Sequence, residues 1–156
     1  MSDAPAPAAP VLALQIQYIK DLSFEAPNAP AIFTRLTEAP EINVDVNVSV
    51  TRLQDNFYEV VLHFDVKAAA KGETAFILEL AYGAVAQVNP EDPDHLQPLL
   101  LIEVPRLVFP FARALISDTT RDGGFPPLLL QPIDFVQLYR ARLERAAAEA
   151  QTEQKQ

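Results

Sequence analysis

The feature that most constrains this fold is a set of three segments with apolar side chains at alternate positions. Residues 42–50 and 57–68 place apolar side chains at even positions and mostly polar ones between them, and residues 74–88 place Phe76, Leu78, Leu80 and Tyr82 on one side. Such a period of two is typical of strands that bury one face. The turns at 54–56 and 70–73 are short, which favours hairpins between neighbouring strands. The sequence therefore predicts an antiparallel meander.

A further strand precedes these segments. Its even positions are apolar, and Lys20 interrupts the alternation, which predicts a bulge or a sheet edge there. Pro27 and Pro30 end this strand at a rigid corner, because each fixes its own φ and restricts the residue before it. A helical turn is expected over 31–36. The residues assigned to the apolar face of the strand are Leu12, Leu14, Ile16, Tyr18, Leu22 and Phe24.

The second half of the chain changes to helical spacing. After a loop over 89–94, we expect a helix that Pro105 and Pro110 interrupt, with its main body over 106–117. Gly123 and Gly124 mark its end. A last helix is predicted to start with Pro132 as its first residue.

These elements predict one α+β domain, a four-stranded antiparallel sheet packed with helices from the C-terminal half. We assign residues 11–146 to this domain, residues 1–10 to a disordered tail and residues 147–156 to a polar flexible tail.

The net charge of −9 restricts the partners that the chain can bind. An acidic surface repels phosphate backbones and anionic membranes, so we expect no nucleic-acid partner and no membrane insertion. A basic protein is the natural complement. Solubility alone remains an alternative explanation of the charge.

The residues of common catalytic and ligand sites are absent or unsuitably spaced. The 156 residues include no cysteine, two histidines and four glycines, and neither a phosphate-binding loop nor a nucleophile elbow occurs. The sequence thus predicts no enzyme, no metal site and no cofactor. The first residues lack the basic and apolar regions of a secretory signal, so a cytoplasmic location is expected.

Several segments resemble the SecB family of bacterial protein-export chaperones. The resemblance begins with Lys20-Asp21-Leu22-Ser23-Phe24-Glu25-Ala26-Pro27-Asn28-Ala29-Pro30. It continues in 57–62 and 72–76, which are similar to strands of the family, and in Leu107-Val108-Phe109-Pro110-Phe111-Ala112-Arg113, which is similar to its central helix. Gly124-Phe125-Pro126-Pro127-Leu128 and Pro132-Ile133-Asp134-Phe135 extend it, so that it covers roughly residues 14–145.

This resemblance implies a tetramer, built as a dimer of dimers, that acts as an ATP-independent chaperone. Such a protein holds unfolded preproteins in the cytoplasm and delivers them to the export ATPase SecA. It needs no catalytic group, because apolar grooves and sheet edges bind the exposed side chains and backbone of the client.

The resemblance also suggests where the partners bind. An acidic docking face for SecA would consist of Asp21, Glu25, Ile77 and Glu79, provided that the first and fourth strands share a sheet. The candidate client groove is lined by Ile42, Val44, Val46, Phe76 and Phe111, for which packing in the core is the alternative. Leu78, Leu80 and Tyr82 are assigned either to a subunit interface or to the core.

A protein that binds a small ligand is the competing hypothesis for the whole chain. It would be an enzyme or a carrier of lipid or another apolar ligand, with a pocket between sheet and helices. A monomer with a bound ligand would support it, whereas a large particle that suppresses aggregation would support the chaperone.

Overall fold

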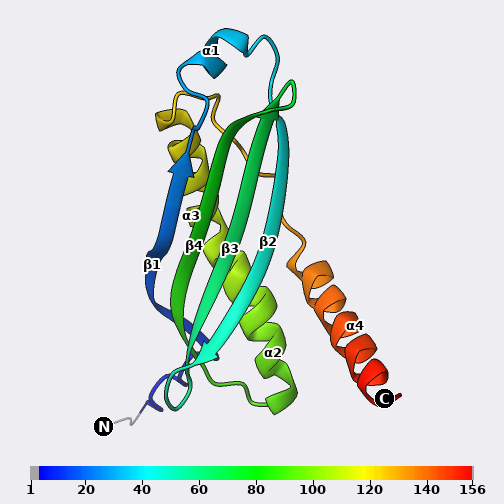
Figure 1. Cartoon of the computed structure of the whole chain (residues 1–156). Coiled ribbons are helices and arrows are strands. Elements are labelled where there is room, and N and C mark those ends of the chain that lie inside the picture. Colours follow the sequence, from blue (N-terminus) through cyan, green and yellow to red (C-terminus); the bar gives the residue numbers. More distant parts are fainter. Residues whose placement is uncertain (1–3, 156) are drawn as a thin grey trace.

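Four strands pair into one twisted antiparallel sheet in the order β1-β4-β3-β2 (Figure 1). The computed structural model describes residues 4–155. Its strands are β1 (Leu12–Glu25), β2 (Glu41–Arg52), β3 (Phe57–Ala70) and β4 (Glu73–Val88). The predicted meander is present in β2, β3 and β4. β1 lies beside β4, because the corner after β1 and the short helix α1 (Ala31–Arg35) carry the chain to the opposite edge of the sheet.

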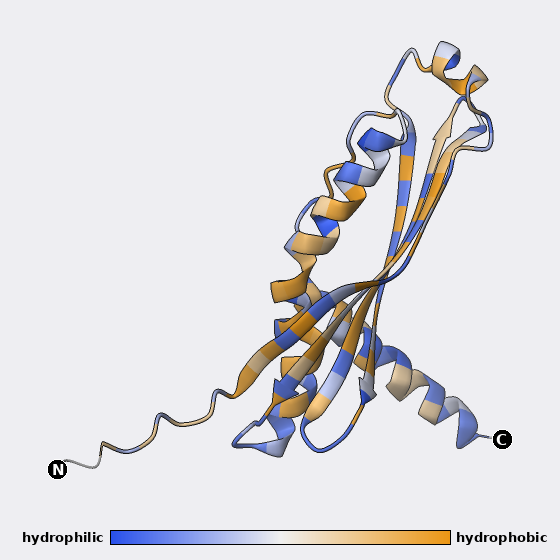
Figure 2. Ribbon diagram, turned by 90° about the vertical axis from the view of Figure 1, so that its left-hand side faces the viewer, coloured by the Kyte–Doolittle hydropathy of each residue, from blue (hydrophilic) through white to orange (hydrophobic). Residues whose placement is uncertain are grey.

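The two faces of the sheet differ as the alternation predicts, and Figure 2 shows the hydropathy changing from residue to residue along the strands. We call the face that packs against the helices the inner face and the opposite one the outer face. Even-numbered residues of β3 and β4 fill the inner face, and most are less than 3% exposed. A fully buried branched or aromatic side chain contributes about 1.5–3 kcal/mol, so this face supplies much of the stability.

The first strand departs from the predicted pattern. Its pairing with β4 shifts between Leu14 and Ile16 and again between Ile19 and Asp21. The second shift confirms the bulge expected at Lys20. The first shift was not predicted, and it turns Ile16 and Tyr18 to the outer face, because one extra residue reverses the side to which later side chains point.

The helix predicted to be broken is instead a continuous helical run. A 3-10 turn (Pro93–His95), α2 (Leu96–Pro98) and a π-helical turn (Leu99–Glu103) lead directly into α3 (Val104–Asp122). Pro105 comes directly after the π turn, in which the Val104 N–H donates to the Leu99 carbonyl. The wider hydrogen-bond spacing of the π turn keeps the run helical at the point where proline cannot donate a hydrogen bond. Pro110 lies on an exposed part of α3.

The last helix, α4 (Phe135–Glu153), begins three residues later than predicted. Its N-cap is Asp134, whose side chain accepts a hydrogen bond from the Gln137 backbone N–H at 3.1 Å. The helix continues through residues 147–153, which the sequence assigned to a flexible tail. Residues 4–10 are exposed and form no helix or strand, while residues 1–3 and 156 of the predicted tails lie outside the described residues.

An aromatic cluster joins the corner after β1 to the segment after α3. The ring of Phe76 on β4 lies 5.5 Å from that of Phe24 and 5.0 Å from that of Phe125. The end of α3 passes so close that a Cβ on Gly123 would lie 2.3 Å from Phe24 Cζ. Gly124 has a φ of +90°, which favours glycine. The two glycines therefore end the helix and also make room for the cluster.

Thr120 ties the crossing segment, residues 123–134, to α3. Its hydroxyl donates to the Ile116 carbonyl at 2.9 Å and accepts from the Leu128 backbone N–H at 2.9 Å. Thr120 is fully buried and Leu128 is half-buried, so this hydroxyl satisfies a backbone donor that is partly shielded from water. The bond helps to fix the path that carries the chain from α3 to α4.

We predict that Thr120→Val lowers the free energy of unfolding by about 1–3 kcal/mol, because the Leu128 N–H loses its acceptor. Urea denaturation followed by circular dichroism measures the change. Thr152→Val is the matched control, since Thr152 donates the same kind of bond, to the Ala148 carbonyl at 3.0 Å, on an exposed part of α4. Equal losses in the two variants would contradict the structural role of Thr120.

Candidate binding surfaces

The four residues predicted to form an acidic docking face lie together on the outer face. The pairing of β1 with β4 sets Ser23 opposite Glu79 and Glu25 opposite Ile77. Asp21 lies one outward position before Ser23, opposite Ala81. The side chains of Asp21, Glu25 and Glu79 are exposed, and Ile77 is half-buried among them. We call Asp21, Glu25, Ile77 and Glu79 the acidic face.

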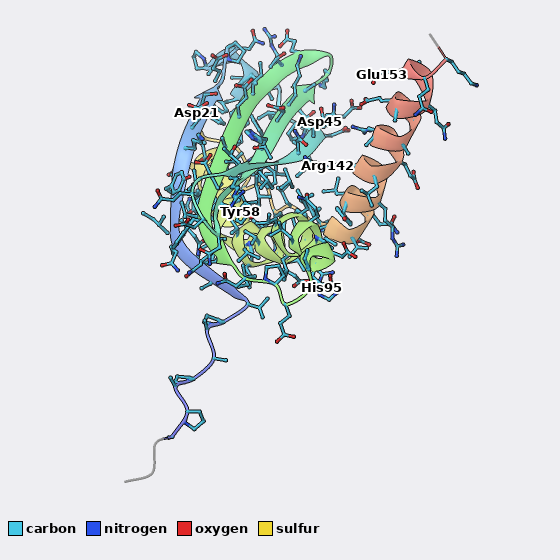
Figure 3. All side chains as sticks on the ribbon, turned by 90° about the horizontal axis from the view of Figure 1, so that it is seen from below. Asp21, Asp45, Tyr58, His95, Arg142 and Glu153 are labelled. Carbon is cyan, nitrogen blue, oxygen red and sulfur yellow. The ribbon has the colours of Figure 1, made fainter. Side chains whose placement is uncertain are left out.

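Negative charge extends from the acidic face across the sheet. Asp65 on β3 lies opposite Glu79, and Asp45 on β2 lies opposite Asp65. All three carboxylates are exposed, and like charges in direct opposition are unfavourable in an isolated sheet. Figure 3 shows Asp21 and Asp45 near opposite edges of the sheet. Sequence reasoning placed Asp45 and Asp65 on polar strand faces, but only the register shows that they continue the row begun by Glu79.

A second polar cluster on the outer face joins β1 to β3. The Tyr18 hydroxyl donates to Glu59 Oε2, and the Lys20 ammonium donates to Glu59 Oε1 at 2.7 Å. Burial, and then the hydrogen bond to Glu59, raises the pKa of Tyr18 to about 12. The hydrogen bond from Lys20, followed by that from Tyr18, lowers the pKa of Glu59. Glu59 therefore remains a carboxylate that receives two donors from β1.

A groove of about 520 Å³ separates β2 from α4. Val46 and Val48 line its sheet side, Leu101 its floor, and Leu138 and Tyr139 its helix side. The helix is attached loosely, because Phe135 is its only buried residue among those described. Most of its surface remains in contact with water, as the position of α4 beside the sheet in Figure 1 illustrates.

One hydrogen bond crosses this groove. Arg142 Nη1 donates to the Val48 carbonyl at 2.8 Å, and Figure 3 shows Arg142 between β2 and α4. β2 is an edge strand, whose outer row of backbone groups has no neighbouring strand. Arg142 thus satisfies one carbonyl on that edge.

The structure brings together only some of the residues predicted to form the client groove. Val46 lines the β2–α4 groove, and Ile42 and Val44 lie on the same side of the same strand. Phe76 is 1% exposed within the aromatic cluster. Phe111 lies on α3, where it is 52% exposed. Sequence reasoning missed Leu101 and the α4 residues as groove residues, although the helical spacing of Leu138 and Tyr139 was visible.

The residues assigned either to a subunit interface or to the core lie in the core. Leu78, Leu80 and Tyr82 are 0%, 2% and 8% exposed in the single chain, so they leave little surface for a second subunit. Other apolar side chains remain open to solvent. Leu107 and Phe111 are one turn apart on α3, and β1 exposes Ile16, Ile19 and Leu22.

The described residues contain no cluster of three or more His, Asp or Glu side chains able to hold a metal ion. Among the helices of residues 4–155, none is long and apolar enough to span a membrane.

Comparison with known proteins identifies the family. Residues 5–146 match the family model described as preprotein translocase subunit SecB. The chain belongs to the SecB family. A protein-export protein SecB of Rhodospirillum rubrum is 54% identical over 137 residues, which cover 88% of this chain and 85% of that protein. The SecB of Paramagnetospirillum magneticum is 53% identical over 160 aligned positions, which cover 100% of this chain and 99% of that protein.

A solved structure shares the fold at low sequence identity. It is a SecB-like chaperone of Mycobacterium tuberculosis in complex with a ChAD peptide from an antitoxin. The two structures superpose with a TM-score of 0.66 and 11% identity, over 78% of this chain and 90% of the other. The SecB-family fold predicted from the sequence is therefore confirmed, and the competing hypothesis of a small-ligand protein is not favoured.

Proposed function

We propose that this SecB-family chain is an ATP-independent chaperone that binds unfolded preproteins in the cytoplasm, keeps them competent for translocation and delivers them to SecA. The observation that carries the proposal is a separation of two surfaces: the apolar groove lies between β2 and α4, whereas the acidic face lies on β1 and β4. One chain can therefore hold a client and a basic partner at different places.

Client binding follows from the chemistry of the groove. An unfolded chain exposes apolar side chains and unpaired backbone groups. Val46, Leu138 and Tyr139 offer apolar surface to the former, and the edge of β2 offers hydrogen-bonding groups to the latter. Because Arg142 occupies the Val48 carbonyl, a client strand that pairs along this edge displaces its guanidinium. Because the chaperone binds clients only in their unfolded state, it shifts their folding equilibrium toward that state by mass action.

The acidic face is the proposed docking site for SecA. Three exposed carboxylates share the outer face with the half-buried Ile77, whose neighbours across the sheet are Glu25 on β1 and Lys67 on β3. The acidic face therefore combines charge attraction with a small apolar contact. A basic segment of the partner would complement the carboxylates, and an apolar side chain within that segment would contact Ile77. Such a contact depends on salt, since exposed charges more than about 8–10 Å apart are screened at physiological ionic strength.

The exposed apolar residues support assembly into a homotetramer. Leu107 and Phe111 form an apolar patch on α3, and β1 is an edge strand that exposes Ile16 on the outer face and Ile19 on the inner face. Stacking of two α3 surfaces would cover the patch on α3, and pairing of two β1 edges would satisfy the free backbone groups of that edge. Several grooves on one particle then hold one long client more tightly than a single groove does.

Three predictions test the proposed function, and the first concerns docking. Reversing charge with Asp21→Lys and Glu25→Lys should weaken SecA binding by roughly tenfold or more, because like charges then meet across the contact. Binding of an unfolded preprotein should stay unchanged. Isothermal titration calorimetry measures both affinities at low and high salt. Glu144→Lys with Glu153→Lys is the control, since it changes the net charge equally on exposed positions of α4. Equal loss of client binding would contradict two separate surfaces.

The second prediction concerns the groove. Leu138→Ser with Tyr139→Ser should raise the Kd for an unfolded client roughly tenfold, because two apolar contacts are lost. The readout is suppression of aggregation of a denatured preprotein without ATP, supported by titration. Leu143→Ser is the control, because Leu143 is 51% exposed on α4 and does not line the groove. If the variant with Leu138→Ser and Tyr139→Ser also binds clients like the parent, the groove is not the client site.

The third prediction concerns assembly. Light scattering should give four times the chain mass of 17.2 kDa, about 69 kDa. Leu107→Asp should reduce this mass to about half, because a charge enters the apolar patch on α3. Leu129→Asp, at a 62% exposed position outside α3, should leave the mass unchanged. A parent protein of 17 kDa would contradict the tetramer.

A further inference from the structure

The direction in which Asp21 points depends on the bulge at Lys20. β1 pairs with β4 through two bulges, and only residues 16–19 lie between them. Each bulge decides to which face the following side chains point, because a shift of one residue exchanges the two faces of a strand. Phe24 anchors the end of the strand by stacking on Phe76, but Asp21 lies three residues before this anchor.

The cluster of Tyr18, Lys20 and Glu59 supplies a second anchor on the outer face. Tyr18 is opposite Gly83 on β4, and Gly83 is opposite Val61 on β3, two residues from Glu59. The Tyr18 ring lies directly over Gly83, where an added Cβ would be only 2.6 Å from Tyr18 Cε2. The absence of a side chain at Gly83 lets the ring cross β4, so that its hydroxyl reaches Glu59.

Glu59 receives its two donors from either side of Ile19. Tyr18 donates to one carboxylate oxygen, and Lys20, the bulge residue, donates to the other. The Glu59 side chain is only 17% exposed, so the ion pair with Lys20 is better shielded than a fully exposed surface pair. The cluster therefore connects β1 to β3, across Gly83 of β4, at the bulge that turns Asp21 outward.

The cluster also directs the charge of Lys20. Lys20 is the residue before Asp21, and a free ammonium there would offset the negative charge of the acidic face. Because Glu59 pairs with Lys20 across β4, the positive charge is neutralised on β3, away from Asp21 and Glu25.

We propose that Tyr18, Lys20 and Glu59, with Gly83 beneath the ring, are positioning residues for the acidic face. They hold the bulge so that Asp21 points to the partner, and they keep the Lys20 ammonium away from the docking carboxylates. This inference rests on the proposed docking role of Asp21 and Glu25.

Two variants that leave the charge unchanged test it. Tyr18→Phe keeps the ring but removes the hydroxyl, and Gly83→Ala places a Cβ where the ring lies. The docking probe is a synthetic peptide rich in lysine and arginine, titrated by calorimetry at several salt concentrations. The client probe is a permanently unfolded, carboxymethylated protein. Tyr58→Phe is the matched control, because Tyr58 lies on the inner side of β3, opposite Ala86.

Both variants should bind the peptide roughly fivefold more weakly, which is a typical size for energetic coupling between sites. The dependence of the affinity on salt should stay the same, because no docking charge is removed. Affinity for the unfolded protein, and both affinities of Tyr58→Phe, should equal those of the parent. Should Gly83→Ala fail to fold, Tyr18→Phe still decides the question.

The proposal is overturned if Tyr18→Phe binds the peptide like the parent, or if docking and client binding fall together, as general destabilisation would cause. Asp21→Lys with Glu25→Lys separates this failure from that of the docking proposal. If charge reversal abolishes peptide binding while Tyr18→Phe has no effect, only the positioning role is wrong. If charge reversal also has no effect, the docking proposal fails, and the positioning role fails with it.

Discussion

Packing of the inner face of the sheet against α3 is the constraint on which the other features depend. Leu62 and Leu78 are completely buried, and Phe64 nearly so, and this burial fixes which side of each strand points inward. Once even positions of β2, β3 and β4 point inward, odd positions must point outward, since successive side chains alternate. The row of Asp45, Asp65 and Glu79 on the outer face is thus a consequence of burying their neighbours.

The two proposed binding surfaces differ in how firmly the fold holds them. The acidic face lies on paired strands, whose backbone hydrogen bonds and buried neighbours keep its carboxylates in place. The groove has one rigid wall, β2, and one wall, α4, that buries little surface of its own. Elements with few buried contacts are the ones that move most easily. This difference fits the proposed roles, in which the acidic face recognises one partner and the groove accepts many client sequences.

Much of the fold could be predicted from the sequence because strand alternation and turn composition are local signals. The four strands, the bulge at Lys20 and the end of α3 at Gly123 and Gly124 were all identified in this way. The break predicted in α3 was wrong, because a π turn directly before Pro105 keeps the run helical although proline donates no hydrogen bond. Residues 147–153 were assigned to a tail from their polarity, yet their alanine, glutamate and glutamine residues have high helix propensity and extend α4.

The sequence by itself determined the family and the two-faced sheet, since each depends on residue spacing along one strand or on a recognisable segment. Only the tertiary structure decided that β1 pairs with β4, that Tyr18 crosses Gly83 to reach Glu59, and that Leu138 and Tyr139 face Val46 across a groove. It also placed Leu78, Leu80 and Tyr82 in the core. The physical reason is that these contacts join residues far apart in sequence, and their partners are chosen by the packing of whole elements, which no local pattern contains.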